Sequence, residues 1–225
     1  MSFRFGRDEQ FDDNLTIRLK ALDLAVASFQ RTTAVLREQE IGPLLQNLPE
    51  PKIYLCPQGH QANLMFDTRA MFQASRELVD FYLGRLWGAT ANSKNRTPVK
   101  FSDFILKLAS GNYDSRPEPI FTWLKQRISF LYTIRAVRNE LKVNPSSAQF
   151  HIDTGRFVMK ISLPFPPQDE VLAPFLNLHN LDRALANKRF FCTLGLDEYF
   201  HHAPLLWEEC GNIFKLSFPH QVSGA

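Results

Sequence analysis

Residues 120–142 read IFTWLKQRISFLYTIRAVRNELK and carry the clearest helical pattern of the chain. Apolar residues recur along this stretch at steps of three and four, which places them on one face of an α-helix. That face holds Trp123, Phe130, Ile134, Val137 and Leu141. Pro117 and Pro119 precede the stretch, and Asn144-Pro145 ends it. A helix this long must bury its apolar face, so the stretch predicts packing against other helices.

In chain order, residues 13–42 predict the first long helix, residues 67–87 the second and residues 120–142 the third. The first begins near Asp13 or Asn14, either of which can cap exposed backbone N–H groups. Its apolar positions follow alternating steps of four and three. Such a near-heptad stripe suits lengthwise packing against another helix. Gly42-Pro43 ends the helix. The stripe consists of Leu15, Leu19, Leu22, Val26, Phe29, Thr33 and Leu36.

Besides the first and third long helices, helices are expected over residues 67–87, 102–108 and 168–188. A Pro-containing loop insertion separates the first two long helices, over about residues 42–66, with a short extended piece at residues 52–55. Because Gly and Pro interrupt regular secondary structure, we interpret this insertion as a connection and not as part of the core.

The periodicity changes after the helix of residues 120–142. Asp153-Thr154-Gly155 lies between two β-prone runs, which predicts a β-hairpin over about residues 150–163. Residues 190–200 are compatible with either a strand or a helix. The expected fold class is therefore all-α, a bundle of about four to six helices with a small appended β-hairpin. A chain of 225 residues fits one large domain, here taken as residues 1–225.

The composition is that of a globular protein, with 44% hydrophobic and 22% charged residues. No apolar run approaches the ~18 residues of a membrane span, so no membrane association is expected. Residues 1–13 are charged and predict no secretory signal. Three scattered cysteines do not form a disulfide framework, which favours the cytoplasm. A net charge of +3 permits contact with nucleic acid without requiring it.

The end of the third long helix carries a basic edge. Arg135, Arg138 and Lys142 are three or four residues apart and therefore share one stripe, which Asn139 borders. Neighbouring cations repel each other unless an anion or acidic groups face them. Two interpretations stay open: a phosphate-binding edge, or the solvated side of an amphipathic helix.

This basic edge resembles the motif of the HEPN superfamily, commonly Arg-Asn-x-x-Lys-His at the end of a long helix. In this chain Arg138 matches the motif Arg, Asn139 its polar neighbour, and Lys142 the residue before the His. The resemblance implies a small helical bundle, often dimeric, in a family with many metal-independent ribonucleases of toxin–antitoxin and defence systems. It implies that Arg138 and Asn139 are the candidate catalytic residues.

Val143 stands where the family has its His, and valine cannot transfer a proton. The first hypothesis is therefore a catalytically degenerate HEPN-like protein that binds RNA, nucleotide or a partner protein through Arg135, Arg138, Asn139 and Lys142. Such a protein would form a homodimer along the first or third long helix. A second is an active ribonuclease in which His151 replaces the missing His. A third is a structural protein whose basic stripe pairs with acidic residues of its own fold.

Other chemistry has weaker support in the sequence. Cys56 and His60 lie close together, but no Cys-x-x-Cys pair exists and the remaining Cys and His residues are distant, so neither a metal nor a cofactor is predicted. The same two residues could in principle form a nucleophilic Cys–His pair, but the sequence shows no sign of an oxyanion hole or of a third, orienting group. His201-His202 precede Pro204 and are read as a surface turn.

Overall fold

The computed structural model describes residues 7–42, 53–92, 96–98, 100–163 and 190–219. Within these ranges it contains six α-helices and a four-stranded sheet. The helices are α1 (Arg7–Leu36), α3 (Gln58–Ala89), α4 (Phe101–Ala109), α5 (Pro119–Lys125), α6 (Ile128–Val143) and α9 (Leu196–Ser217). The strands are β1 (Ile53–Leu55), β2 (Gln149–Asp153), β3 (Arg156–Leu163) and β4 (Phe190–Gly195). A π-helical turn, η1 (Arg37–Ile41), follows α1, and a 3-10 turn, η2 (Pro145–Ser147), follows α6.

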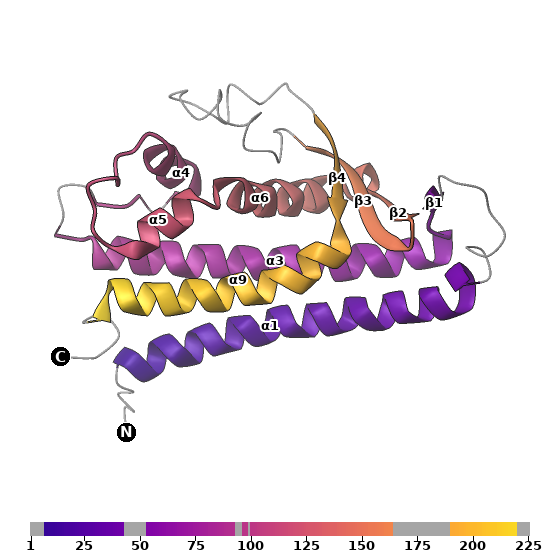
Figure 1. Cartoon of the computed structure of the whole chain (residues 1–225), viewed down its shortest axis with the longest axis horizontal. Coiled ribbons are helices and arrows are strands. Elements are labelled where there is room, and N and C mark those ends of the chain that lie inside the picture. Colours follow the sequence, from indigo (N-terminus) through magenta and orange to yellow (C-terminus); the bar gives the residue numbers. More distant parts are fainter. Residues whose placement is uncertain (1–6, 43–52, 93–95, 99, 164–189, 220–225) are drawn as a thin grey trace.

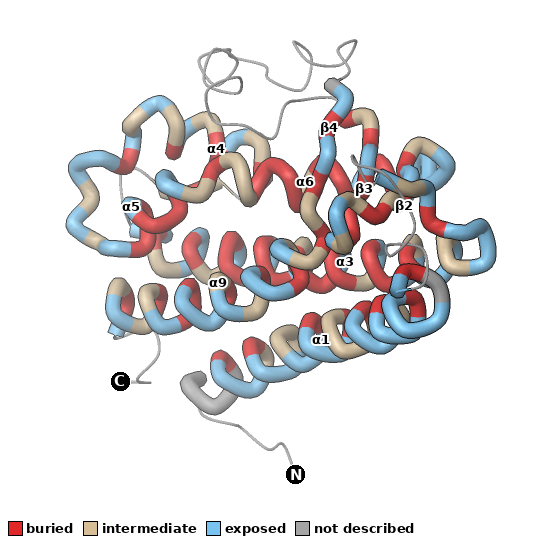
Figure 2. The backbone as a smooth tube through the Cα atoms, turned by 45° about the vertical axis from the view of Figure 1, so that its right-hand side comes forward, coloured by how far each residue is buried: buried red, intermediate tan, exposed pale blue. Residues whose placement is uncertain are grey.

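The long helices lie lengthwise beside one another (Figure 1). Helix α3 is the central one, since it packs against α1 on one side, α6 on another, and α9 as well. Helices α4 and α5 cover one end of the assembly, and the sheet lies at the other. The burial pattern follows this arrangement, because the sides of α3, α6 and α9 that face one another are buried while the outer side of α1 is exposed (Figure 2).

The sheet is antiparallel, with the strand order β1-β2-β3-β4. The hairpin between β2 and β3 turns at Thr154 and Gly155, whose φ angles of 51° and 83° match the tight turn that right-handed strand twist favours. Phe150 pairs with Met159 and Ile152 with Phe157, and all four side chains are buried. One face of the sheet therefore belongs to the core.

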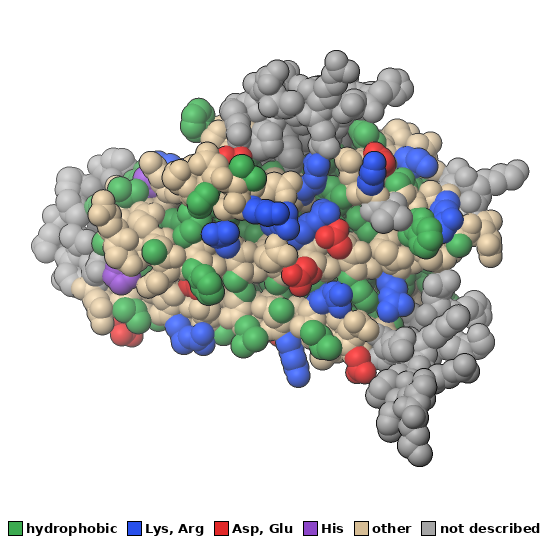
Figure 3. All heavy atoms as spheres, turned by 180° about the vertical axis from the view of Figure 1, so that it is seen from behind, with side chains coloured by type: hydrophobic (Ala, Val, Ile, Leu, Met, Phe, Trp, Pro, Cys, Tyr) green, Lys and Arg blue, Asp and Glu red, His purple; other side chains and the backbone are tan. Residues whose placement is uncertain are grey.

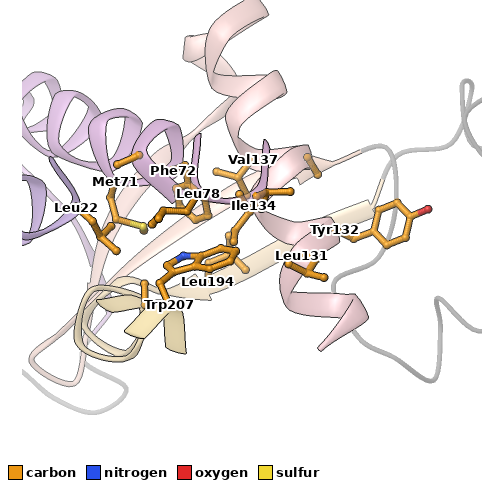
Figure 4. Packing of buried hydrophobic residues seen from close by; sticks show 14 of the residues in the cluster. Leu22, Met71, Phe72, Leu78, Leu131, Tyr132, Ile134, Val137, Leu194 and Trp207 are labelled. Carbon is orange, nitrogen blue, oxygen red and sulfur yellow. The ribbon is translucent and has the colours of Figure 1, made fainter. Parts of the chain in front are cut away.

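The core joins residues from every layer of the fold. Trp207 of α9 is 1% exposed and stacks on Tyr82 of α3, with ring centroids 5.9 Å apart. Figure 4 shows Leu22 and Met71 near this indole, with Ile134 and Val137 on its other side. Aromatic pairs of this kind add about 0.5–1.5 kcal/mol beyond the area they bury. The Phe-rich composition is thus used mainly in the interior.

The expectation of a mostly helical fold is confirmed, but the all-α class and the isolated hairpin are corrected. The hairpin of residues 150–163 is present, and β1 and β4 extend it on both edges into a sheet. Residues 190–200, left open between strand and helix, contain both: β4 ends at Gly195 and α9 begins at Leu196. The short extended piece at residues 52–55 is β1.

The helix expected over residues 120–142 is broken into α5 and α6. Arg127 has φ −122° and ψ 23°, outside the helical region. Its guanidinium carbon lies 4.2 Å from the ring centroid of Trp123, and its Nη2 forms an ion pair of 3.1 Å with Glu209 of α9. These two contacts stabilise the break. The break turns the apolar face of α5 toward α9, whereas the face of α6 packs on α3.

Two helix starts differ from expectation. Helix α1 begins at Arg7, before Asp13, because Phe11 is 1% exposed and stacks on Phe214 of α9 at 5.4 Å. Helix α3 begins at Gln58, so the loop expected to reach residue 66 is too long. Pro57 precedes that helix as its N-cap, a place where proline is tolerated. The short helix of residues 102–108 is confirmed as α4, and the one expected over 168–188 lies outside the described residues.

No helix in the described part of the chain is long and apolar enough to cross a membrane.

Candidate functional site

A surface groove of about 400 Å³ lies between α3 and α6. Helix α6 is fixed beside α3 because its inner residues, among them Val137, are buried in the shared core. The outer residues of the two facing helices then form the walls. Helix α3 contributes Phe66, Arg69, Ala70 and Gln73, and α6 contributes Arg138, Leu141 and Lys142.

Arg138 is held at the groove by two hydrogen bonds. Its Nε donates to Oε1 of Gln73 across the groove at 2.9 Å, and its Nη1 donates to Oδ1 of Asn139 at 3.1 Å. Within the described residues, the Nη2 group of Arg138 has no partner. The guanidinium is therefore oriented while part of its donor capacity stays available for a ligand.

Further cations surround Arg138. Arg69 and Lys142 line the groove with it, and among the described residues that line it none is acidic. Arg135 and Arg76 lie behind, with their guanidinium carbons 5.9 and 5.0 Å from the ring of Phe101. Figure 3, which shows the face opposite the view of Figure 1, shows several Lys and Arg side chains in its middle, with Asp and Glu side chains beside them.

The pKa of Arg76, beside this cluster, is lowered. Partial burial of its guanidinium is the largest cause, and the positive charges of Arg135 and Arg138 lower it further. Asp80 opposes the shift through an ion pair of 2.7 Å with Arg76. Asp80 thus balances one cation of the cluster, while the cations at the groove face outward without a carboxylate in the described lining.

The structure brings together most of the residues singled out from the basic edge. Arg138 and Lys142 line the groove, Asn139 contacts Arg138, and Arg135 lies one helical turn before them. Val143, at the position of the family His, is 81% exposed at the last residue of α6.

His151 does not join them. It lies in β2, paired with Leu55 of β1 and Val158 of β3, and none of the contacts of the described residues links it to Arg138. Its Nε2 is buried without a hydrogen-bond partner. Burial, and then the charge of Lys160, lowers the pKa of His151, so its imidazole is neutral at pH 7. Within the described residues, the strand pairings of His151 connect it to β1 and β3.

Sequence reasoning missed the wall of the groove that α3 supplies. Phe66, Arg69 and Gln73 follow helical spacing of three and four, but no motif marks them. Phe66 was the available signal: it is 71% exposed and lies out of phase with Leu64 and Met71, which are buried seven residues apart. A single exposed apolar residue is common on protein surfaces, so Phe66 alone does not mark the groove in the sequence.

No protein-family model, curated protein or solved structure matches this chain.

The chemistry of the groove therefore follows from its own residues. Its described lining offers guanidinium, ammonium and amide donors beside an exposed aromatic ring. These donors suit the groove to bind an anion.

Among the described residues, the other Cys and His side chains form no competing site. Cys192 and Cys210 are buried, and burial raises the pKa of both thiols, so neither supplies a thiolate. Across the described ranges no three His, Cys, Asp or Glu side chains cluster as metal ligands. His201 and His202 lie within α9 rather than in the surface turn expected from Pro204, which the helix accommodates.

Proposed function

We propose that this protein is a catalytically degenerate HEPN-like protein that binds single-stranded RNA in the groove between α3 and α6. The observation that carries the proposal is the joint lining of this groove by Arg69, Arg138 and Lys142, without a carboxylate among its described residues. RNA carries one phosphate per nucleotide, and neutralising phosphates is the main source of affinity for nucleic acids.

The residues that line the groove favour single-stranded RNA over a small inorganic anion or an acidic protein. Arg138 offers a planar guanidinium that suits a phosphate, and Gln73 keeps it in place. Phe66 presents an exposed ring in the same groove, on which a base can stack for about 1–3 kcal/mol. Cations beside an exposed aromatic ring are the usual elements of a single-strand binding surface.

The same residues argue against cleavage. Val143 stands in place of the motif His, and His151 lies in the sheet without contact to Arg138. General acid–base catalysis contributes about 10²–10⁴-fold to reactions of this kind, and its absence leaves binding as the remaining activity. A role in defence or in a toxin–antitoxin pair is what the HEPN resemblance implies for such a binder.

The test is RNA binding and RNA cleavage by the purified chain, Arg138→Ala and Arg156→Ala. Arg156 is the matched control, because it is an exposed arginine at the β2–β3 hairpin with only a long ion pair of 3.5 Å to Glu198. Fluorescence anisotropy with a labelled single-stranded RNA should show Arg138→Ala binding roughly tenfold more weakly, with Arg156→Ala near the unchanged chain. The slope of affinity against salt should also fall by about one for Arg138→Ala.

A mixed single-stranded RNA ladder in EDTA gives the second readout. We expect no cleavage by any of the three proteins. Cleavage that disappears in Arg138→Ala would overturn the degenerate assignment and establish a metal-independent ribonuclease. Equal RNA affinity of all three proteins would overturn the groove as an RNA site and leave a structural role for the basic edge.

A further inference from the structure

The groove between α3 and α6 has two ends of different character. Gln73 of α3 is hydrogen-bonded to Arg138 of α6. Three residues further along α3, Arg76 lies beside the ring of Phe101, and so does Arg135, three residues earlier in α6. The two helices are therefore antiparallel. One end of the groove lies at the start of α3 and the end of α6, and the other lies toward the second half of α3.

Carboxylates stand at the second of these ends. Glu77 follows Gln73 by one helical turn, and its Oε1 accepts a hydrogen bond from Nε2 of Gln73 at 3.0 Å. Asp80 follows at the next position of the same side of α3 and forms an ion pair of 2.7 Å with Arg76. Both acidic side chains are exposed. A strand of phosphates that continued in this direction would have to pass two carboxylates, which repel it.

The first end is free of such charges among the described residues. Residues 58–66 of α3 and residues 143–147, from the end of α6 through η2, contain no Asp or Glu. Phe66 and Val143 are exposed on this side. A strand can leave the groove over this uncharged surface. The distribution of charge is therefore that of a groove closed at one end, which suits the terminus of a strand better than its middle.

Three cations, Arg69, Arg138 and Lys142, line the groove between these two ends. An internal phosphate of RNA has a single negative charge. A terminal phosphomonoester carries about 1.5–2 negative charges at pH 7 and has three strong acceptor oxygens, so it satisfies more of these donors. We propose that the groove holds the terminal phosphate of single-stranded RNA, with the strand leaving past Phe66. This inference rests on the proposed function, since it names which part of the RNA the groove recognises.

The hydrogen bonds around Gln73 support a phosphate at this place. Because Nε2 of Gln73 donates to Glu77, its Oε1 faces Nε of Arg138 and orients that guanidinium. Glu77 thus has two effects: it orients Gln73 and it closes the groove to further phosphates. Phe66 precedes Gln73 by seven residues, about 10 Å of helical rise. The groove, of about 400 Å³, can then hold the phosphate among the cations and the terminal base beside the Phe66 ring.

The first test compares four internally labelled RNAs of one sequence by anisotropy: 5′-phosphorylated, 3′-phosphorylated, with hydroxyl groups at both ends, and circular. We expect one of the two phosphorylated strands to bind roughly tenfold more tightly than the hydroxyl-ended strand, which also tells which end is held. The circular RNA should bind no more tightly than the hydroxyl-ended strand. Arg138→Ala should lose the preference, and Arg156→Ala, the exposed arginine of the hairpin, should keep it.

The outcomes separate this inference from the function on which it rests. Equal affinity for all four RNAs would overturn the terminal phosphate and leave RNA binding in place. Failure of every RNA to bind would overturn the proposed function itself. A nucleoside monophosphate that binds as tightly as the phosphorylated strand would overturn the strand as the ligand.

The second test opens the closed end of the groove. Glu77→Gln keeps an acceptor for Gln73 and removes the charge, so circular RNA should bind roughly fivefold more tightly at low salt, and the preference for a phosphorylated end should fall. Glu208→Gln is the matched control, because Glu208 is exposed on α9, which contributes no residue to the described lining of the groove. Unchanged affinity for circular RNA in Glu77→Gln, or an equal rise in Glu208→Gln, would contradict the closed end.

Discussion

An ion pair between Arg37 and Asp197 joins two segments that are 160 residues apart in the chain. Nη2 of Arg37, in the π-helical turn after α1, donates to Oδ1 of Asp197 in the first turn of α9 at 2.9 Å. The other carboxylate oxygen of Asp197 accepts the backbone N–H of Phe157 in β3 at 2.8 Å. The side chain of Asp197 thus links the turn after α1, strand β3 and the first turn of α9.

Asp197→Ala should lower the free energy of unfolding by about 1–2 kcal/mol, because it leaves the N–H of Phe157 without its acceptor and removes a negative charge from the N-terminus of α9. Urea unfolding measures the change. Glu198→Ala is the control: Glu198 lies next to it in the same turn but makes only an exposed contact of 3.5 Å with Arg156. Equal losses in the two variants would contradict the role of Asp197 as a fastening point.

Local sequence patterns predicted the elements that are formed by residues close together in the sequence. The β2–β3 hairpin follows from Asp153-Thr154-Gly155, and the apolar stripe from Leu15 to Leu36 fits the buried seam of α1. The complete four-stranded sheet could not be predicted from local sequence patterns. Its edge strands β1 and β4 are short, and each pairs with a partner far away in sequence, so only tertiary packing defines them.

The same distinction explains the site. The α6 wall was predictable because Arg138, Asn139 and Lys142 share a helix and their spacing fixes a common edge. Gln73 was not, because its bond to Arg138 spans 65 residues and depends on how α3 packs on α6. The break at Arg127 was likewise hidden, since its cause is Glu209 on a distant helix.

Gln73→Glu should weaken RNA binding more than Gln73→Ala does. The new carboxylate would replace an amide oxygen 2.9 Å from Nε of Arg138 and neutralise the cation that, under the proposed function, faces the phosphate. We expect roughly a tenfold loss of affinity for the Glu variant at low salt and a smaller loss for the Ala variant, both measured by anisotropy. Gln30→Glu, an exposed glutamine of α1, adds the same charge outside the groove. A loss as large in Gln30→Glu would show an effect of net charge alone.

The stability of the fold should decline at alkaline pH because of Cys192. Burial raises the pKa of this thiol from 9.0 to about 11. Below pH 9 the thiol is protonated in both the folded and the unfolded states, so it has no effect on stability. As pH rises from 9 toward 11, the unfolded chain loses this proton first, and the free energy of unfolding falls.

Thermal unfolding at pH 8 and pH 10 measures this decline. In Cys192→Ala the decline should be smaller than in the unchanged chain, although the starting stability is lower because a buried side chain has been truncated. The comparison therefore uses the difference between the two pH values within each protein. Identical differences in the two proteins would contradict the contribution of Cys192.

Val143→His tests whether the missing proton carrier is what separates this chain from a ribonuclease. Val143 is 81% exposed at the end of α6, so a His side chain can replace it without disturbing the core. An exposed imidazole has a pKa near 6.5 and can serve as both acid and base near neutral pH. Under the proposed function, the variant should cleave single-stranded RNA in EDTA where the unchanged chain does not, with a maximum near the imidazole pKa. Val143→Asn adds polarity without a titrating group and should stay inactive, and Val143→His/Arg138→Ala should lose the gain. A Val143→His protein that binds RNA with unchanged affinity yet cleaves none would show that the loss of activity has a cause other than the His position.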